Sequence, residues 1–455
     1  MFRAILLVPL VACTGGDPSE PTTDRDSDPD VDPVAEGPFW YGEVEPVVRE
    51  NCVTCHQAGA IGPFVLDDYE TAKAWAGAVS VAVTERSMPP WLVTDDGTCQ
   101  TFAHSRALED AEIELIAAWA EAGAPEGDPS LAVSDPNPVP PALDRVDLTV
   151  STPTFVPIAE GVPSAEHDEY RCFLIEDPTD RDLFVTGFDV VPGNEAIVHH
   201  VLGMPVDPAA LGYDGRPNRV NIDEMNGADG RDGWDCFGTA GGNIQEKGVP
   251  IVWAPGMGAV EMPDGIGVRV AENDVMVIQV HYNLVDPDTV GQSDQTSIRL
   301  RTETDGIREA HLALPDLFLD SLFSGNPDVI PPGESAYEYT FSAKAWELLA
   351  YSGAPQSSWD QPVELAGIMP HMHALGREQH VRVIRADGTD ECLSEVLSWD
   401  FHWQLWYFYE QPVILDPEDE VEITCVWDTT GVEGPTLPGW GTQSEMCLST
   451  LMLVP

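Results

Sequence analysis

Apolar and polar residues follow two different periods along the chain. In the N-terminal part, apolar residues recur at helical spacing over 70–86 and again over 110–122, and Gly123 supplies a helix stop after the second stretch. From about Val146 onward, short runs of Val, Ile, Phe and Tyr alternate with Gly, Pro and Asp turns, which is typical of antiparallel β-sandwiches. This β-rich remainder is too long for one sandwich, so we expect two, with a boundary near residue 301.

The charge of the chain is strongly negative. Its 455 residues include 21 Lys and Arg against 78 Asp and Glu, a formal net charge of -57. Such a field repels polyanions, so nucleic acid is not an expected partner and the charge does not favour anionic membranes. We expect a small-molecule substrate that is neutral or cationic. The hydrophobic content of 43% is enough for several buried cores.

The first residues have the composition of an export signal. A short basic start precedes an apolar run over 4–10 that is too brief to span a bilayer. The following Leu-Val-Ala-Cys resembles a bacterial lipobox, in which Cys13 receives lipid; a free Cys in an ordinary signal peptide is the alternative. Residues 14–37 are acidic and poor in large apolar side chains, as in a disordered tether. We therefore expect export to the periplasmic side or the cell surface, with a lipid anchor in a bacterial membrane.

Cys52-Val53-Thr54-Cys55-His56 resembles the haem-attachment site of c-type cytochromes. Two thiols at this spacing each add to a haem vinyl group while the adjacent imidazole reaches the iron. A zinc knuckle that uses the same thiols is the alternative.

Met88 is the expected second axial ligand of this haem. The two prolines that follow it hold the segment extended, and a thioether raises the haem potential. A buried core methionine is the alternative, with His104 the next ligand candidate. Helix, haem, methionine loop and helix together predict one covalent haem c in a small all-α cytochrome c domain.

The expected organisation is therefore a mixed multidomain fold. It consists of a signal peptide and lipobox (1–13), an acidic tether (14–37), the cytochrome c-like haem domain (38–130), a Pro-rich linker (131–145) and two jelly-roll-like antiparallel β-sandwiches (146–301 and 302–455).

Histidines in the β-rich part form two candidate metal centres. The strand pattern over 275–282 places Gln279 and His281 on one face of an otherwise apolar strand. His371 and His373 are spaced so that both side chains point to the same face and can share a metal. His199 and His200 are adjacent, so their joint ligation requires a strand end or a bend.

In this order the motifs resemble the copper type II ascorbate-dependent monooxygenases, the family of peptidylglycine α-hydroxylating and dopamine β-hydroxylating enzymes. The resemblance covers about 146–455. It implies two coppers and O2 as co-substrate. It assigns the ligands as follows: His199, His200 and His281 for an electron-transfer copper, and His371, His373 and Met446 for the copper at which catalysis occurs. Three imidazoles also suit zinc, and Met446 by itself also suits a core position, but a thioether ligand selects copper.

The nine cysteines leave six after Cys13, Cys52 and Cys55 are assigned. The resemblance implies a disulfide between Cys425 and Cys447, next to the methionine ligand. Cys172 and Cys236 are a candidate second pair, whereas Cys99 and Cys392 remain unassigned, because sequence does not fix connectivity.

The resemblance implies hydroxylation of an activated C–H bond of a small organic substrate. Peptidylglycine enzymes hold a substrate carboxylate with Arg, Asn and Tyr, where this chain has Met369, Leu448 and Thr450, so we expect a different substrate. Electrons would arrive one at a time through the fused haem, from ascorbate, or from an external donor. The alternative is an exported electron-transfer or copper-binding lipoprotein without hydroxylase activity.

Overall fold

The computed structural model describes residues 37–58, 60, 62–134, 142–159, 167–236, 238–255, 257–321, 326–401, 403–439 and 444–455. The predicted signal, the lipobox and nearly all of the acidic tether therefore lie outside the described residues, as does the proline run at 135–141. Within the described part, no helix is both long and apolar enough to cross a membrane.

The N-terminal helices pack on one another around Trp40, Ile116 and Trp119, all almost fully buried. Helix α2 starts after Asp68, whose carboxylate accepts the N–H of Thr71, and it buries residues at three- and four-residue spacing. The elements of this helical segment are η1 (Trp40–Val44), α1 (Glu45–Asn51), α2 (Tyr69–Thr84), α3 (Asp110–Glu121) and η2 (Pro129–Leu131). Helices α2 and α3 match the two stretches of helical spacing in the sequence.

Two sheets form the first β unit (148–309). The six-stranded sheet contains β1 (Leu148–Ser151), β10 (Ser297–Glu303), β3 (Leu183–Val191), β8 (Ile266–Val270) and β11 (Arg308–Glu309), with β7 (Val260–Glu261) paired to β3. The five-stranded sheet contains β5 (Trp234–Asp235), β2 (Asp168–Ile175), β9 (Val275–Asn283), β4 (Val198–Val206) and β6 (Ile251–Trp253). All these pairings are antiparallel except that of β11 with β8.

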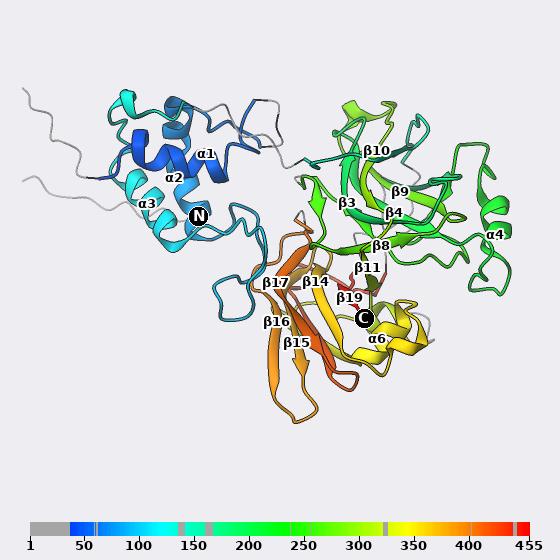
Figure 1. Cartoon of the computed structure of the whole chain (residues 1–455). Helices are drawn as coiled ribbons and strands as arrows, with labels where there is room; N and C mark the ends of the chain where they lie inside the picture. Colours follow the sequence, from blue (N-terminus) through cyan, green and yellow to red (C-terminus); the bar gives the residue numbers. More distant parts are fainter. Residues whose placement is uncertain are drawn as a thin grey trace, which may run out of the picture.

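Two further sheets form the second β unit (311–454). One contains β12 (His311–Ala313), β19 (Leu448–Val454), β14 (Val363–His371) and β17 (Tyr407–Leu415). The other contains β13 (Tyr337–Lys344), β18 (Glu420–Trp427), β15 (Gly376–Ile384) and β16 (Asp390–Val396). Short helices connect strands in both units: α4 (Asn218–Met225), η3 (Pro287–Thr289), α5 (Leu317–Asp320), α6 (Ala345–Tyr351) and η5 (Gln356–Ser358). Figure 1 shows the helical segment and the two β units as three regions of the molecule.

The predicted fold class is wrong in its helical part. The structure is mostly β, and only α2 and α3 exceed eight residues. Residues 91–103, here called the strap, leave the helices and lie on the second β unit, where Val93 and Phe102 join its core. The prolines after Met88 and the Asp95-Asp96-Gly97 turn prevent a helix there, so the expected all-α domain over 38–130 does not exist as a self-contained unit.

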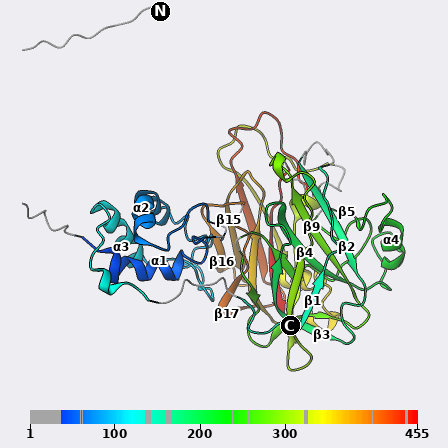
Figure 2. The same ribbon diagram turned by 90° about the horizontal axis from the view of Figure 1, so that it is seen from above.

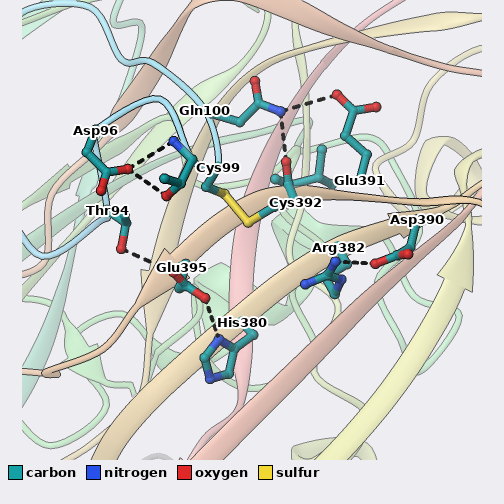
Figure 3. Close-up of a disulfide and its surroundings, with 12 residues drawn as sticks. Thr94, Asp96, Cys99, Gln100, His380, Arg382, Asp390, Glu391, Cys392 and Glu395 are labelled. Atoms are coloured by element: carbon teal, nitrogen blue, oxygen red, sulfur yellow. Dashed lines mark hydrogen bonds and ion pairs between the residues drawn. A yellow bond between two sulfur atoms is a disulfide. The ribbon is translucent and has the colours of Figure 1, made fainter.

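The strap is attached to the second β unit by backbone pairing and by a disulfide. Val93 forms an isolated bridge with Val396, and Phe102 forms one with Tyr409. Figure 3 shows Cys99 bonded to Cys392 of β16, residues 293 apart in the sequence. The view from above agrees that the helical segment lies beside β16 and β17 (Figure 2).

The picture of two independent sandwiches also needs correction. The sheet β12-β19-β14-β17 is buried on both faces. In β19, Leu451 and Leu453 belong to the core of the second unit, whereas Met452 and Val454 belong to the core of the first. The run of consecutive apolar residues at the end of the chain is typical of a strand covered on both faces. The two units therefore share a continuous interior.

Candidate functional site

A β-bulge brings the first histidine set together. In the pairing of β4 with β9, the register shifts between Val198 and His200, and His200 lies opposite His281. The extra residue, His199, is released from the regular alternation of the strand, which would otherwise direct it away from its neighbour. Ring nitrogens of His199, His200 and His281 consequently lie within 4.8 Å of one another.

The first set is held in an orientation that suits a metal. Nδ1 of His281 lies 3.2 Å from Nδ1 of His200, and Nε2 of His281 lies 3.2 Å from a carboxylate oxygen of Asp168. The ring of Tyr170 stacks on His281 with centroids 3.9 Å apart. Burial lowers the pKa of both His200 and His281, with Asp168 opposing the shift at His281. The neutral imidazoles that a cation requires are thus favoured, with the Nδ1 atoms directed to the common centre.

The second histidine set lies at the end of β14. His371 is the last residue of the strand and His373 follows two positions later, with ring centroids 5.2 Å apart. Nδ1 of His371 pairs with Oε1 of Gln404 at 2.7 Å, and Nδ1 of His373 pairs with the carbonyl oxygen of Ser444 at 2.8 Å. Both acceptors place the ring proton on Nδ1 and leave Nε2 as the ligand atom. Burial lowers the pKa of His371 to about 4, against the opposing effect of Gln404.

Glu445 positions this set, and the sequence motif did not reveal it. Its buried carboxylate accepts the backbone N–H groups of His373 at 3.0 Å and Leu375 at 2.7 Å, and Nε1–H of Trp427 at 2.8 Å. Burial raises the pKa of Glu445 to about 7. The residue that precedes Met446 therefore ties the histidine loop to the methionine segment.

One cavity joins the two sets. It is lined by His200 and His281 from the first unit and by His371, His373 and Met446 from the second, and it measures about 110 Å³. Phe401, also missed from sequence, has its ring 5.7 Å from that of His199 and 5.9 Å from that of His373. Side chains that are far apart in the sequence thus line one cavity between the two β units.

Three disulfides surround these elements. Cys425 is bonded to Cys447, directly after Met446, and Cys172 is bonded to Cys236; these are the two pairings expected from the sequence. Cys99 and Cys392, which were left unassigned, form the strap bridge. No periodicity in the sequence signals this last contact, because it depends on how the strap docks.

The Cys52–His56 motif lies at the end of α1. Both thiols are free and half-buried, and burial raises the pKa of the Cys52 thiol to about 12. Nδ1 of His56 pairs with the carbonyl oxygen of Phe64 at 3.0 Å, which leaves Nε2 available. Gly62 lies against this ring, since a Cβ there would be 2.7 Å from Nδ1 of His56. Met88 follows α2 and is half-buried, with its N–H bonded to the carbonyl oxygen of Ala82.

Comparison with known proteins places this site in a functional context. Residues 326–455 match the family model "Copper type II ascorbate-dependent monooxygenase, C-terminal domain". Most of the second β unit (311–454) therefore corresponds to this domain model. This unit contributes His371, His373 and Met446 to the cavity.

Similar proteins include monooxygenases and hydroxylases from animals. Tyramine beta-hydroxylase of Caenorhabditis briggsae is 22% identical over 311 residues, 65% of this chain and 47% of the relative. Human dopamine beta-hydroxylase is 24% identical over 315 residues, 65% of this chain and 44% of the relative. Peptidyl-glycine alpha-amidating monooxygenase A of Xenopus laevis is 24% identical over 293 residues, 63% of this chain and 26% of the relative. The match thus spans about half or less of each relative, and these similarities support an oxidoreductase of the copper monooxygenase type.

Proposed function

We propose that the chain is a copper-dependent monooxygenase that hydroxylates an activated C–H bond of a small organic substrate with O2. The observation that carries this proposal is the cavity lined by both histidine sets and Met446. Two imidazoles with a thioether suit copper better than zinc, because soft sulfur ligands select Cu(I). The donor set therefore fits the metal that the family requires.

The chain's own residues prepare two binding sites of different character. His199, His200 and His281 would hold one copper through buried imidazoles that Asp168 and Tyr170 orient. His371, His373 and Met446 would hold the other. When bound, copper supplies the one-electron and O2 chemistry.

Gln404 and the Ser444 carbonyl keep the Nδ1 protons of His371 and His373 in place during binding. Apolar side chains from both units make up most of the wall of the space between the sites.

Metal content and oxygen uptake test the proposal. We expect two coppers per chain, and O2 consumption that depends on a reductant such as ascorbate and on substrate. His371→Ala and Met446→Ala should each remove about one copper and abolish turnover. The control is His380→Ala on β15, where the imidazole faces Glu378 and Glu395 outside the cavity. One copper, or zinc, would contradict the proposal; copper binding without O2 uptake would favour an electron-transfer or copper-binding protein.

Cys52, Cys55 and His56 would attach a haem c that delivers electrons. Support comes from the two free thiols, since the six other described cysteines are paired, and from the available Nε2 of His56. Attached haem supplies a one-electron carrier. Met88 would be its second axial ligand. The strap ties the helical segment to the second β unit, which favours electron delivery within one chain.

Haem attachment is testable by expression with a c-type maturation system. The haem should remain on the denatured chain, and Cys52→Ala with Cys55→Ala should release it. Met88→Ala should change the spectrum of the reduced protein. Pre-reduced haem should reoxidise when O2 and substrate are added. Haem that stays reduced would show that ascorbate or another donor supplies the coppers directly.

The protein would be exported and lipid-anchored through Cys13. The three disulfides support an oxidising compartment. In a bacterial host, Cys13→Ser should move the protein from the membrane fraction to the soluble fraction without changing its copper content. Retention in the membrane would contradict lipidation at this residue.

A further inference from the structure

The cavity between the two histidine sets has walls that carry no formal charge. Apart from histidines, its described lining consists of apolar, aromatic and a few uncharged polar residues, and no Asp, Glu, Lys or Arg is among them. Leu202 and Val252 contribute from the first unit, and Met369 and Leu448 from the second. A charged guest would lose its hydration there and find no opposite charge.

Two carboxylates that contact the histidine sets do not change this conclusion. Asp168 is engaged by His281 and by Nδ2–H of Asn283, and Glu445 accepts three N–H groups. Neither carboxylate lines the cavity. Aromatic rings attract a cation only weakly compared with the hydration that it gives up.

One polar atom on the wall has no partner. Thr450 lies on β19, directly opposite Met369 of β14, and its side chain lines the cavity. The residue is 0% exposed, and its Oγ1 makes no hydrogen bond within the described structure. Buried hydroxyls are normally paired, so an orphan at a cavity wall indicates a bound group that pairs with it. Gln404 also lines the wall, but both of its amide atoms already have a partner: Oε1 pairs with His371 and Nε2 donates to the Phe401 carbonyl.

We propose that the cavity binds a small, uncharged, mainly apolar molecule with one hydroxyl or carbonyl group, and that Thr450 Oγ1 hydrogen-bonds to that group. This proposal rests on the proposed function, because the bound molecule is the substrate of the monooxygenase. The volume of about 110 Å³ is of the same order as that of a cavity that binds benzene, which favours a compact molecule of about one ring. The net charge of the chain allowed neutral or cationic substrates. The uncharged walls of the cavity restrict them to neutral molecules.

Four probes of nearly equal shape separate charge from polarity: benzyl alcohol, toluene, benzylammonium and benzoate. Binding is measured by calorimetry on the full-length, copper-loaded protein, reduced and without oxygen, so that no turnover occurs. We expect benzyl alcohol to bind at least about tenfold more tightly than either ion, and about three- to tenfold more tightly than toluene.

Variants at Thr450 test the hydrogen bond. Thr450→Val should reduce benzyl alcohol binding to the level of toluene and leave toluene binding unchanged, whereas Thr450→Ser should retain the preference. Thr340→Val, which removes an exposed hydroxyl on β13, is the matched control and should change neither.

Equal or tighter binding of benzoate or benzylammonium would overturn the proposal, as would binding of none of the four probes. Unchanged benzyl alcohol binding in Thr450→Val would overturn the role of the hydroxyl. Copper content and O2 uptake are measured on the same preparation. If the protein binds the neutral probes preferentially but takes up no O2, the proposed class of ligand is supported and hydroxylation is refuted. Failure of the ligand proposal can therefore be distinguished from failure of the proposed function.

Discussion

Removal of the Cys99–Cys392 bridge tests how firmly the strap holds the helical segment to the second β unit. The perturbation is Cys99→Ala together with Cys392→Ala, which leaves the backbone pairing intact. That pairing consists of N–H of Thr94 to the Glu395 carbonyl at 2.7 Å, N–H of Ala103 to the Phe408 carbonyl at 2.8 Å, and N–H of Glu410 to the Thr101 carbonyl at 3.0 Å. Figure 3 shows the bridge together with Gln100, whose Nε2–H donates to the Cys392 carbonyl.

The size of the effect follows from the loop that the bridge closes. If the backbone pairing on both sides persists, the bridge constrains a loop of roughly 10 residues, and loop-closure entropy gives about 3 kcal/mol. If the bridge is the only attachment, the relevant loop is the full separation of 293 residues, and the same relation gives about 6 kcal/mol. The buried side chains of Val93 and Phe102 favour the first case.

Hydrogen exchange at Thr94 and Ala103 reports the opening of the strap directly. We expect exchange at both amides to accelerate about 100-fold in the double variant, because about 1.4 kcal/mol corresponds to a factor of ten. The control, Cys172→Ala with Cys236→Ala, removes a bridge of the first β unit and should leave both amides unchanged.

Two outcomes would refute this reasoning. Exchange that is unchanged within about threefold would mean that packing alone holds the strap. Acceleration near 10,000-fold would mean that the backbone pairing contributes nothing without the bridge. In either case, exchange within α2 and α3 should stay the same, because these helices have their own core.

Three further predictions concern other parts of the chain. Burial raises the pKa of Glu246 to about 7. The folded state therefore binds the proton more tightly than the unfolded state. The free energy of unfolding should fall by up to about 3 kcal/mol as the pH rises from about 4.5 through 7. Glu246→Gln should remove this loss in denaturant unfolding at pH 5 and 8, and an equal difference from wild type at both pH values would contradict it. Arg171 is fully buried, and besides the exposed Asp229 and Asp235 it donates to the carbonyl oxygens of Asp232 and Gly233. Its change to Ala should lower the free energy of unfolding by about 2–5 kcal/mol, because a cavity remains and two carbonyl groups lose their donor; a thermal midpoint within a degree of wild type would refute this. Gln404→Leu should weaken copper binding at the second set about 10- to 100-fold in competition with a chelator, and unchanged affinity would show that the Gln404 amide does not orient its histidine.

Local patterns in the sequence determined several features of this protein. The periodicity over 70–86 and 110–122 predicted α2 and α3 within about two residues, since helical burial depends on spacing along one segment. The pleat of β9 likewise separated Gln279 and His281 from their apolar neighbours. The spacing of His371 and His373 also placed both on one face, whereas His199, His200 and Met446 were assigned to their sets only through the resemblance to a known family.

Contacts between distant segments were decided by the tertiary structure. The bulge that turns His199 toward His281 exists only in the pairing of β4 with β9. Glu445 accepts the backbone N–H of His373, which lies 72 residues earlier in the chain. The strap lies where the sequence predicted part of an all-α domain. Its Cys99 is bonded to Cys392, 293 residues away in the sequence. A periodic pattern records which side of an element is buried, but not what covers it. Cross-strand register and the sharing of one interior by two β units are set by packing of the whole chain, so they become visible only in the folded structure.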